Sequence, residues 1–227
     1  MLKEWNELPG FMKSDDVRPY YETLSKKKIS LFLKRLFDVV VGLIVLLILI
    51  IPMIVVSILI KLDSEGPVFY RQERVTKYGK VFKIHKFRTM VVNADKIGNL
   101  VTVDNDNRIT NIGNKLRKYR IDEFPQILDV LSGNMSFVGT RPEAIKYVNQ
   151  YKSEYYATLL LPAGITSEAS IKYKDESKLL NIAEDVDEAY INEVLPIKME
   201  YNLKSIKKFN ILSDIKCMIN TVVAVLE

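Results

Sequence analysis

The stretch VVVGLIVLLILIIPMIVVSILI, from Val39 to Ile60, decides the overall design of this chain, because it holds 22 consecutive residues without a charge. As one straight helix it would be about 33 Å long, enough to cross the ~30 Å hydrocarbon core of a bilayer. Pro52 lies inside it. A proline has no N–H to donate and its ring clashes with the preceding turn, so it kinks or breaks a helix. Val39–Ile51 alone would reach only about 20 Å, which is too short to cross.

Basic residues flank this apolar stretch at both ends. Lys34, Arg35 and the triplet 26–28 precede it, and Lys61, Arg71, Arg74 and Lys77 follow it. Basic residues near a membrane segment favour the cytoplasmic side, so both ends are predicted to remain there. A re-entrant hairpin, which dips into the membrane and returns, satisfies both flanks. A single span satisfies one, and a buried core helix of a soluble protein is the third alternative.

Composition limits the environment of the chain. The formal net charge is +5 and the pI is about 9, which beside an apolar stretch fits an anionic membrane surface better than nucleic acid. The single cysteine, Cys217, excludes an internal disulfide and fits a reducing compartment. The first 30 residues have no apolar core of a signal peptide. We therefore expect an N-terminal surface extension at 1–28, a retained anchor at 29–60 and a cytoplasmic domain at 61–227.

The local patterns predict an α+β fold: a small α/β cytoplasmic domain with membrane-interface helices behind a proline-broken membrane hairpin helix. Val68–Tyr70 and Val81–Ile84 have strand composition and predict a hairpin. Residues 93–114 predict a polar loop. Helices are expected from about 121 to 131, over 142–161, over 187–207 with a possible break at Pro196, and along the apolar stripe between 211 and 226.

The possible chemistry is narrowed by elimination. With one histidine and one cysteine, a Cys/His zinc site is excluded, and His85 is expected to be a structural or substrate-contacting residue. Neither a Walker loop nor a GxGxxG motif is present. The pair Asp122-Glu123 follows Arg117, Lys118 and Arg120 at an expected helix start. Nearby guanidinium groups keep an aspartate ionised and nucleophilic, although ordinary helix capping explains the same two residues.

A second group of residues is basic. Lys83, Lys86 and Arg88 lie within Val81–Met90, and Arg141 follows Gly139-Thr140. Arginine binds phosphate in a bidentate manner and lysine supplies a point charge. A solvated strand face is the alternative explanation, and interleaved aromatics are also typical of single-stranded nucleic-acid binding. Asp104, Asn105 and Asp106 offer oxygens for a divalent ion, but a polar loop is the simpler interpretation.

Taken together, these residues resemble the bacterial monotopic phosphoglycosyl transferases, the initiating sugar-phosphate transferases of glycan assembly. The resemblance covers about residues 34–143, in consistent order and spacing. The segments that carry it are KRLFD (34–38) leading into the apolar stretch, GPVFYRQ (66–72), FKIHKFRTM (82–90), RIT with IG (108–113), LRK (116–118), DEFPQ (122–126) and GNMSFVGTRPE (133–143). Residues 162–167, PAGITS, are similar to a later family segment.

The resemblance implies a mechanism. Asp122 would attack the β-phosphate of a UDP-sugar, releasing UMP and leaving a phosphosugar on the enzyme, which a polyprenyl phosphate, usually undecaprenyl phosphate, then takes. Glu123 would be its partner and bind Mg²⁺, and Lys86, Arg88, Arg117 and Arg141 would face phosphates or nucleotide. The anchor would re-enter at Pro52, with Lys34, Arg35 and Asp38 at its start. Capsule, O-antigen, exopolysaccharide and glycoprotein synthesis are the pathways implied.

Four positions depart from the family pattern: Asn134, Thr140, Ala163 and Ser167. They leave the chemistry intact and put sugar and nucleotide recognition in question. A catalytically degenerate, membrane-anchored scaffold is therefore the alternative function. The expected location is the cytoplasmic face of the bacterial inner membrane, with membrane lipid as a partner, no nucleic acid, and an oligomer left open by the C-terminal stripe. The sequence does not identify the sugar.

Overall fold

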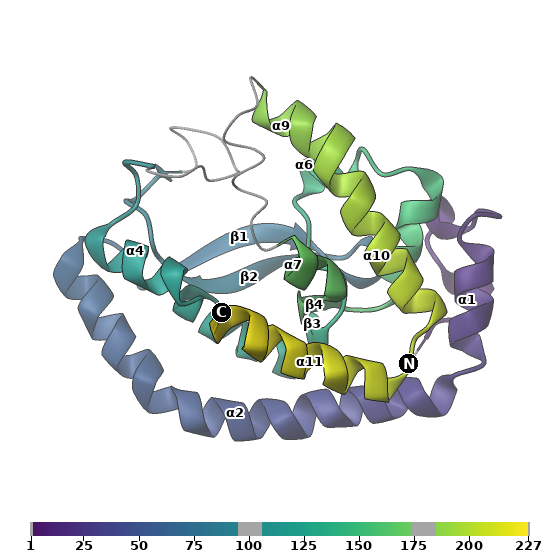
Figure 1. The fold of residues 1–227 in the computed structure, drawn as a ribbon, viewed down its shortest axis with the longest axis horizontal. Helices are drawn as coiled ribbons and strands as arrows, with labels where there is room; N and C mark the ends of the chain where they lie inside the picture. The colour runs from purple at the N-terminus through teal and green to yellow at the C-terminus, as the bar shows by residue number, and fades with distance from the viewer. Residues whose placement is uncertain (1, 95–105, 174–184, 227) are drawn as a thin grey trace.

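The computed structural model of the protein describes residues 2–94, 106–173 and 185–226, and it has the mixed α+β architecture expected from the sequence (Figure 1). The helices are α1 Arg18–Ser25, α2 Lys28–Asp63, α4 Asn111–Lys118, α5 Ile127–Leu131, α6 Ile145–Val148, α7 Glu168–Lys172, α9 Val186–Ala189, α10 Leu195–Lys207 and α11 Ile211–Leu226. The strands are β1 Phe69–Val75, β2 Val81–Phe87, β3 Met135–Val138 and β4 Ala163–Thr166. Tight 3-10 segments are η1 Trp5–Glu7, η2 Gly10–Met12, η3 Lys77–Gly79, η4 Ile121–Gln126 and η5 Ser153–Leu160, and Tyr190–Val194 forms a π-helical turn, η6.

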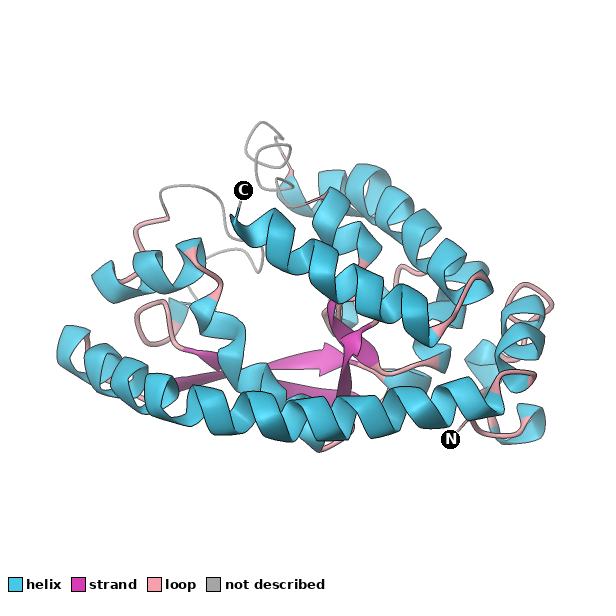
Figure 2. Ribbon diagram, turned by 60° about the horizontal axis from the view of Figure 1, so that its bottom comes forward, coloured by secondary structure: helices cyan, strands magenta, loops and turns pink. Residues whose placement is uncertain are grey.

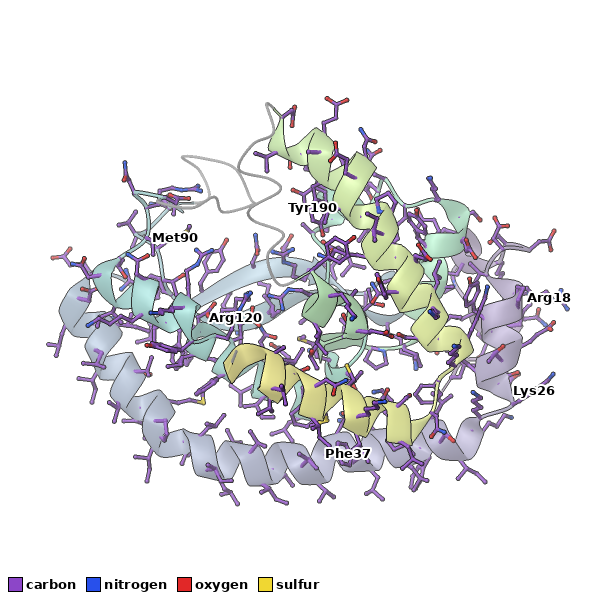
Figure 3. The ribbon with its side chains drawn as sticks, viewed as in Figure 1. Arg18, Lys26, Phe37, Met90, Arg120 and Tyr190 are labelled. Atoms are coloured by element: carbon purple, nitrogen blue, oxygen red, sulfur yellow. The ribbon has the colours of Figure 1, made fainter. Side chains whose placement is uncertain are left out.

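The apolar stretch forms most of α2, a 36-residue helix that continues through Pro52. The helix is therefore not broken at the proline; it curves along one edge of the molecule (Figure 1). Its most apolar 18-residue window is only 17% buried, and apolar side chains project from it away from the rest of the protein (Figure 3). A core helix of a soluble protein would be mostly buried, so the exposure argues against that alternative.

The first turns of α2 are fastened to the domain by charged residues from the KRLFD segment. Lys34 Nζ donates to Val138 O at 2.8 Å and to Asp214 Oδ2 at 2.6 Å. Asp38 Oδ1 accepts from Ser136 Oγ at 3.0 Å and from the Phe137 amide at 3.1 Å. We call Lys34, Asp38, Ser136 and Asp214 the anchor network, which joins α2, β3 and α11.

Two further contacts continue this fastening along α2. Arg35 donates to the carbonyls of Val130 and Leu131, at 2.7 and 2.8 Å, at the end of α5. At the other end of α2, Asp63 Oδ2 accepts from the first-turn amide of Ile112 in α4 at 3.0 Å. Both ends of the apolar helix are thus held by the same body.

The N-terminal segment differs from the expected surface extension. Its apolar side chains are buried in the largest core cluster, together with one face of α10. The buried residues from this segment are Leu8, Met12, Val17, Tyr20 and Leu24. Between 0% and 3% of each is exposed, so residues 2–25 are part of the folded domain. The prediction was wrong because the mixed composition hid an apolar face distributed over two 3-10 turns and a short helix.

The strands form two pairs in the described residues. β1 and β2 are the predicted hairpin, antiparallel with Gln72 opposite Ile84, and both strands are longer than expected. β3 and β4, which the sequence did not predict, are parallel, with Met135 beside Ala163. Gly139, the residue after β3, packs against Gly164 of β4: a Cβ on Gly164 would lie 2.2 Å from the Gly139 amide nitrogen. Only glycine permits that close approach.

The remaining helical predictions are confirmed in part. Residues 142–161 contain the short helices α6 and η5 instead of one long helix. Of the expected loop 93–114, residues 95–105 lie outside the described part, and its last residues form the first turn of α4. α9, η6 and α10 follow one another without a gap, so the chain is not interrupted at Pro196. Pro196 lies in the first turn of α10, where a proline is tolerated. α11 forms as predicted. Its first turn contacts α2 through Asp214 and Lys34, and its C-terminal end lies apart from α2 (Figure 2).

Candidate active site

The candidate site is built on η4, which follows α4 through a strained turn. Arg120 has a positive φ of 56°, which is uncommon for a residue other than glycine, and it lies where α4 meets η4 (Figure 3). Pro125 is accommodated within the short segment, and η4 packs against β2. This arrangement places Asp122 and Glu123 next to the basic residues of β2.

Glu123 is held by two cations. Arg141 donates to both of its carboxylate oxygens, with the longer contact from Nη1 to Oε2 at 3.3 Å, and Lys86 Nζ donates to Oε1 at 2.8 Å. Although burial alone would raise the pKa of Glu123, Arg141 and Lys86 outweigh it and hold that pKa well below its usual range. Glu123 is therefore ionised at neutral pH.

Asp122 is in the opposite situation. Its side chain is buried and Oδ1 has no hydrogen-bond partner among the described residues. Burial raises the pKa of Asp122, opposed by Lys86 and then, more weakly, by Arg117 and Arg120, while the neighbouring Glu123 charge adds to the rise. A buried carboxylate oxygen without a donor is costly in a folded protein, so Asp122 is a candidate for contact with a ligand.

The structure brings most of the predicted basic residues to this pair. Lys86 and Arg141 contact Glu123 directly, and Arg117 acts on Asp122 electrostatically. Burial lowers the pKa of Lys86, and the Glu123 charge opposes that effect. Lys86, Arg117 and Arg141 thus place positive charge around the two carboxylates. Such an arrangement suits a ligand with several negative charges.

Arg88 is placed elsewhere. Its side chain is 5% exposed and donates to Ser64 O at 2.8 Å and to Glu65 O, at the end of α2. Carbonyls at a helix end are ordinary partners for a cation. The structure therefore shows Arg88 fastening α2 to β2, and its expected contact with phosphate stays a prediction.

Two residues of the site region were not singled out from the sequence. Gln126, the last residue of η4, is 1% exposed and neither polar atom of its side chain has a partner among the described residues. Asp129 is fully buried and binds His85 twice, through the backbone amide and through Nδ1, both at 2.8 Å. These bonds give His85 a structural role, and its contact with substrate stays a prediction. The available signal was spacing: Gln126 follows Asp122 by one turn.

The four departures from the family pattern have local structural roles. Asn134 Oδ1 accepts from Lys80 Nζ at 2.9 Å, and Thr140 O accepts from the Gly164 amide at 2.8 Å. Ala163 N donates to Thr76 Oγ1 at 3.0 Å, and Ser167 Oγ caps α7 by accepting from the Ser170 amide at 3.0 Å. These contacts hold turns, β4 and a helix start. Thr140 and Ala163 also line a small cavity with Arg141, which binds Glu123.

The donor set fits a magnesium ion only in part. Mg²⁺ prefers one or two carboxylates together with substrate phosphates. The unpartnered oxygen of Asp122 is consistent with such a ligand, whereas both oxygens of Glu123 already have cationic partners. No cluster of three or more potential metal ligands occurs among the described residues. Of the alternative Asp104-Asn105-Asp106 site, the first two residues lie outside the described part, and Asp106 pairs with Arg108.

The fold and site define a class of protein: an α+β domain fastened along an exposed apolar helix, with a buried carboxylate pair among cations. The chain belongs to the bacterial sugar transferase family, whose profile matches residues 29–227. It is 33% identical over 99% of its length to a UDP-N-acetylgalactosamine-undecaprenyl-phosphate N-acetylgalactosaminephosphotransferase of Aeromonas hydrophila, of which it covers 51%. It is 34% identical over 97% of its length to a UDP-glucose:undecaprenyl-phosphate glucose-1-phosphate transferase of Escherichia coli K12, of which it covers 44%.

A third relative is shorter. Over 58% of its length the chain is 46% identical to a putative undecaprenyl-phosphate N-acetylgalactosaminyl 1-phosphate transferase of Bacillus subtilis, of which it covers 74%. The chain thus spans about half the length of the first two relatives. The matched regions include the carboxylate pair and the apolar helix in the long alignments, and the names of all three relatives contain undecaprenyl phosphate.

Proposed function

We propose that this protein is a phosphoglycosyl transferase that moves a sugar-1-phosphate from a UDP-sugar to undecaprenyl phosphate and releases UMP. The observation that carries the proposal is the carboxylate pair: Asp122 has an unpartnered oxygen near Lys86 and Arg117, and Glu123 contacts Arg141. The family and the names of the relatives supply the substrate class. Glycan assembly of the capsule or exopolysaccharide type is the corresponding pathway class.

In the first step, an oxygen of Asp122 attacks the β-phosphorus of the UDP-sugar. The bond between that phosphorus and the bridging oxygen breaks, and UMP leaves with the bonding electrons. In the second step, a phosphate oxygen of undecaprenyl phosphate attacks the same phosphorus and expels the Asp122 carboxylate. Phosphoryl transfer depends mainly on positioning and charge stabilisation, and the cations of the site provide both.

A divalent ion fits this chemistry as an addition to the protein's own cations. Bound Mg²⁺ would neutralise charge on the diphosphate, and Asp122 is the carboxylate with an oxygen available to it. Lys86 and Arg141 would bind phosphate oxygens as charge-assisted donors. Because Asp122 is buried, the phosphosugar bonded to its carboxylate is kept away from bulk water.

The geometry of α2 supports a proposal for the membrane arrangement. Its two ends are held by the same body, through Lys34 and Arg35 at one end and Asp63 and Arg88 at the other. A helix that crossed the bilayer would place its ends on opposite sides, so this fastening supports a curved helix that enters and returns. We propose that it rests in the cytoplasmic leaflet of the inner membrane, where the site can reach a lipid phosphate.

The activity is tested by Asp122→Asn in the full chain, assayed for UMP release from a panel of UDP-sugars. We expect at least a ~10³-fold loss, as when a covalent nucleophile is removed. Asp16→Asn is the matched control, since Asp16 is exposed in the N-terminal segment, and it should retain turnover within about threefold. Retained turnover in Asp122→Asn would remove this residue from the proposed role.

The topology is tested by single cysteines introduced near Ser25 and at Lys61 in a Cys217→Ser background. Both positions should resist labelling by an impermeant thiol reagent added from outside the cell and react after the membrane is opened. Labelling of either position from outside would rule out the returning helix.

A further inference from the structure

The two adjacent carboxylates of the site differ in what already binds them. Glu123 is engaged on both oxygens, by the two terminal nitrogens of Arg141 and by Lys86. A divalent ion bound to Glu123 would have to displace a bidentate guanidinium, which is among the stronger partners of a carboxylate. The contacts at Asp122 leave Oδ1 without a partner.

The charges around the pair also disfavour a metal ion bound in the absence of substrate. Lys86 and Arg141 contact Glu123, and Arg117 and Arg120 act on Asp122. These four positive charges exceed the two negative charges of the pair, so a free divalent cation meets net repulsion. A nucleoside diphosphate brings the negative charge that would balance both the cations and a metal ion.

We propose that Glu123 is not a metal ligand in this protein but a positioning residue, which holds Lys86 and Arg141 where they bind the diphosphate, and that the divalent ion enters with the nucleotide against Asp122. The inference rests on the proposed function, because it takes a UDP-sugar as the ligand. It has a direct consequence: Glu123 contributes to nucleotide binding whether or not a metal ion is present.

The test measures the affinity of the full-length protein for UDP by calorimetry, once in EDTA and once in excess Mg²⁺. Glu123→Gln should weaken UDP binding by about tenfold in both conditions, because the two cations lose the charge that orients them. An effect of Glu123→Gln that appears in Mg²⁺ and disappears in EDTA would overturn the inference. Glu22→Gln, which removes the charge of an exposed glutamate paired with Arg18, is the matched control and should bind UDP as the unmodified protein does.

A second measurement does not depend on the folding of a variant. The unmodified protein is titrated with Mn²⁺, and bound Mn²⁺ is followed by water-proton relaxation, without and with UDP. Relaxation enhancement should appear only when UDP is present. Stoichiometric Mn²⁺ binding by the protein alone that is lost in Glu123→Gln would contradict the inference. If UDP fails to bind the unmodified protein in any condition, the proposed function itself fails.

Discussion

Two buried polar clusters in this molecule contain the same kinds of side chains and differ in how completely they are bonded. In the anchor network, Lys34 binds Val138 O and Asp214, and Asp38 accepts from Ser136 and Phe137. In the candidate site, Asp122 Oδ1 and both polar atoms of Gln126 lack partners among the described residues. The four side chains of the first cluster bond to one another or to β3, whereas the second cluster leaves buried polar atoms without partners among the described residues.

The difference separates structural from functional burial of charge. A buried ion pair holds elements together when its remaining hydrogen bonds are satisfied, and removing one member leaves an uncompensated charge. A buried carboxylate without donors costs stability and is retained where it meets a substrate. By this criterion, the KRLFD residues fasten the apolar helix, and the DEFPQ residues are the candidates for binding a ligand.

The largest effect on stability is expected in the anchor network. Lys34→Met leaves Asp38 and Asp214 buried without their shared cation and should lower the free energy of unfolding by about 3–5 kcal/mol. Lys86→Met is the matched change in the site and should cost less, because Glu123 keeps Arg141. Thermal unfolding in detergent measures both variants. An equal or larger loss for Lys86→Met would break the distinction between the two clusters.

The adjacent carboxylates should respond in opposite directions. The pKa of Asp122 is raised in the folded state, so its charge opposes folding above that pKa; Asp122→Asn should raise the free energy of unfolding at pH 7 by about 1 kcal/mol. The pKa of Glu123 is lowered, so its charge favours folding above the unfolded value; Glu123→Gln should cost about 1–3 kcal/mol at pH 7.

The size of both effects depends on pH. The contribution of Glu123 should shrink as pH falls from about 4.3 through its folded pKa, and the cost of Asp122 should vanish as pH falls through its raised pKa towards about 3.9. Denaturant unfolding of both variants and the unmodified protein at pH 7 and pH 4 measures this. Destabilisation by Asp122→Asn at pH 7 would mean that its carboxylate is satisfied after all.

The smallest effect is expected at Ser167, whose hydroxyl caps α7. Ser167→Ala should lower the free energy of unfolding by about 1 kcal/mol, the usual cost of losing a helix cap. Ser167→Asp should retain most of the stabilisation, because aspartate also caps helices. Neither change should alter the preference among UDP-sugars, because Ser167 serves α7 and not the carboxylate pair. A changed sugar preference in Ser167→Ala would give this position a role in recognition.

The sequence predicted those elements whose pattern is local. The apolar helix, the hairpin of β1 and β2, and α11 follow from uninterrupted runs or regular spacing of side chains. The parallel pair β3–β4 could not be read in this way, since its strands are separated by a long segment and its close approach depends on Gly139 meeting Gly164. The burial of residues 2–25 was missed for the same reason, because it requires α10 as a partner.

The sequence predicted more of the candidate site than of the fold around it. The pair Asp122-Glu123 and the cations Lys86 and Arg141 were selected from sequence, and the structure brings them together. Arg88 carried the same charge in the same segment, yet it binds the end of α2. Charge type alone could not separate these two roles, because they depend on where β2 ends: Lys86 lies within the strand, and Arg88 follows its last residue, Phe87. Gln126 was missed because an amide carries no charge signal.

The central claim is that Asp122 receives the phosphosugar, and intact and peptide mass spectrometry test it most directly. The unmodified protein, incubated with a turnover-competent UDP-sugar without lipid acceptor and quenched rapidly, should gain the mass of one sugar phosphate. Peptide analysis should locate that mass on Asp122, and added undecaprenyl phosphate should remove it. An adduct on another residue, or its absence in protein shown to turn over UDP-sugar, would contradict the account.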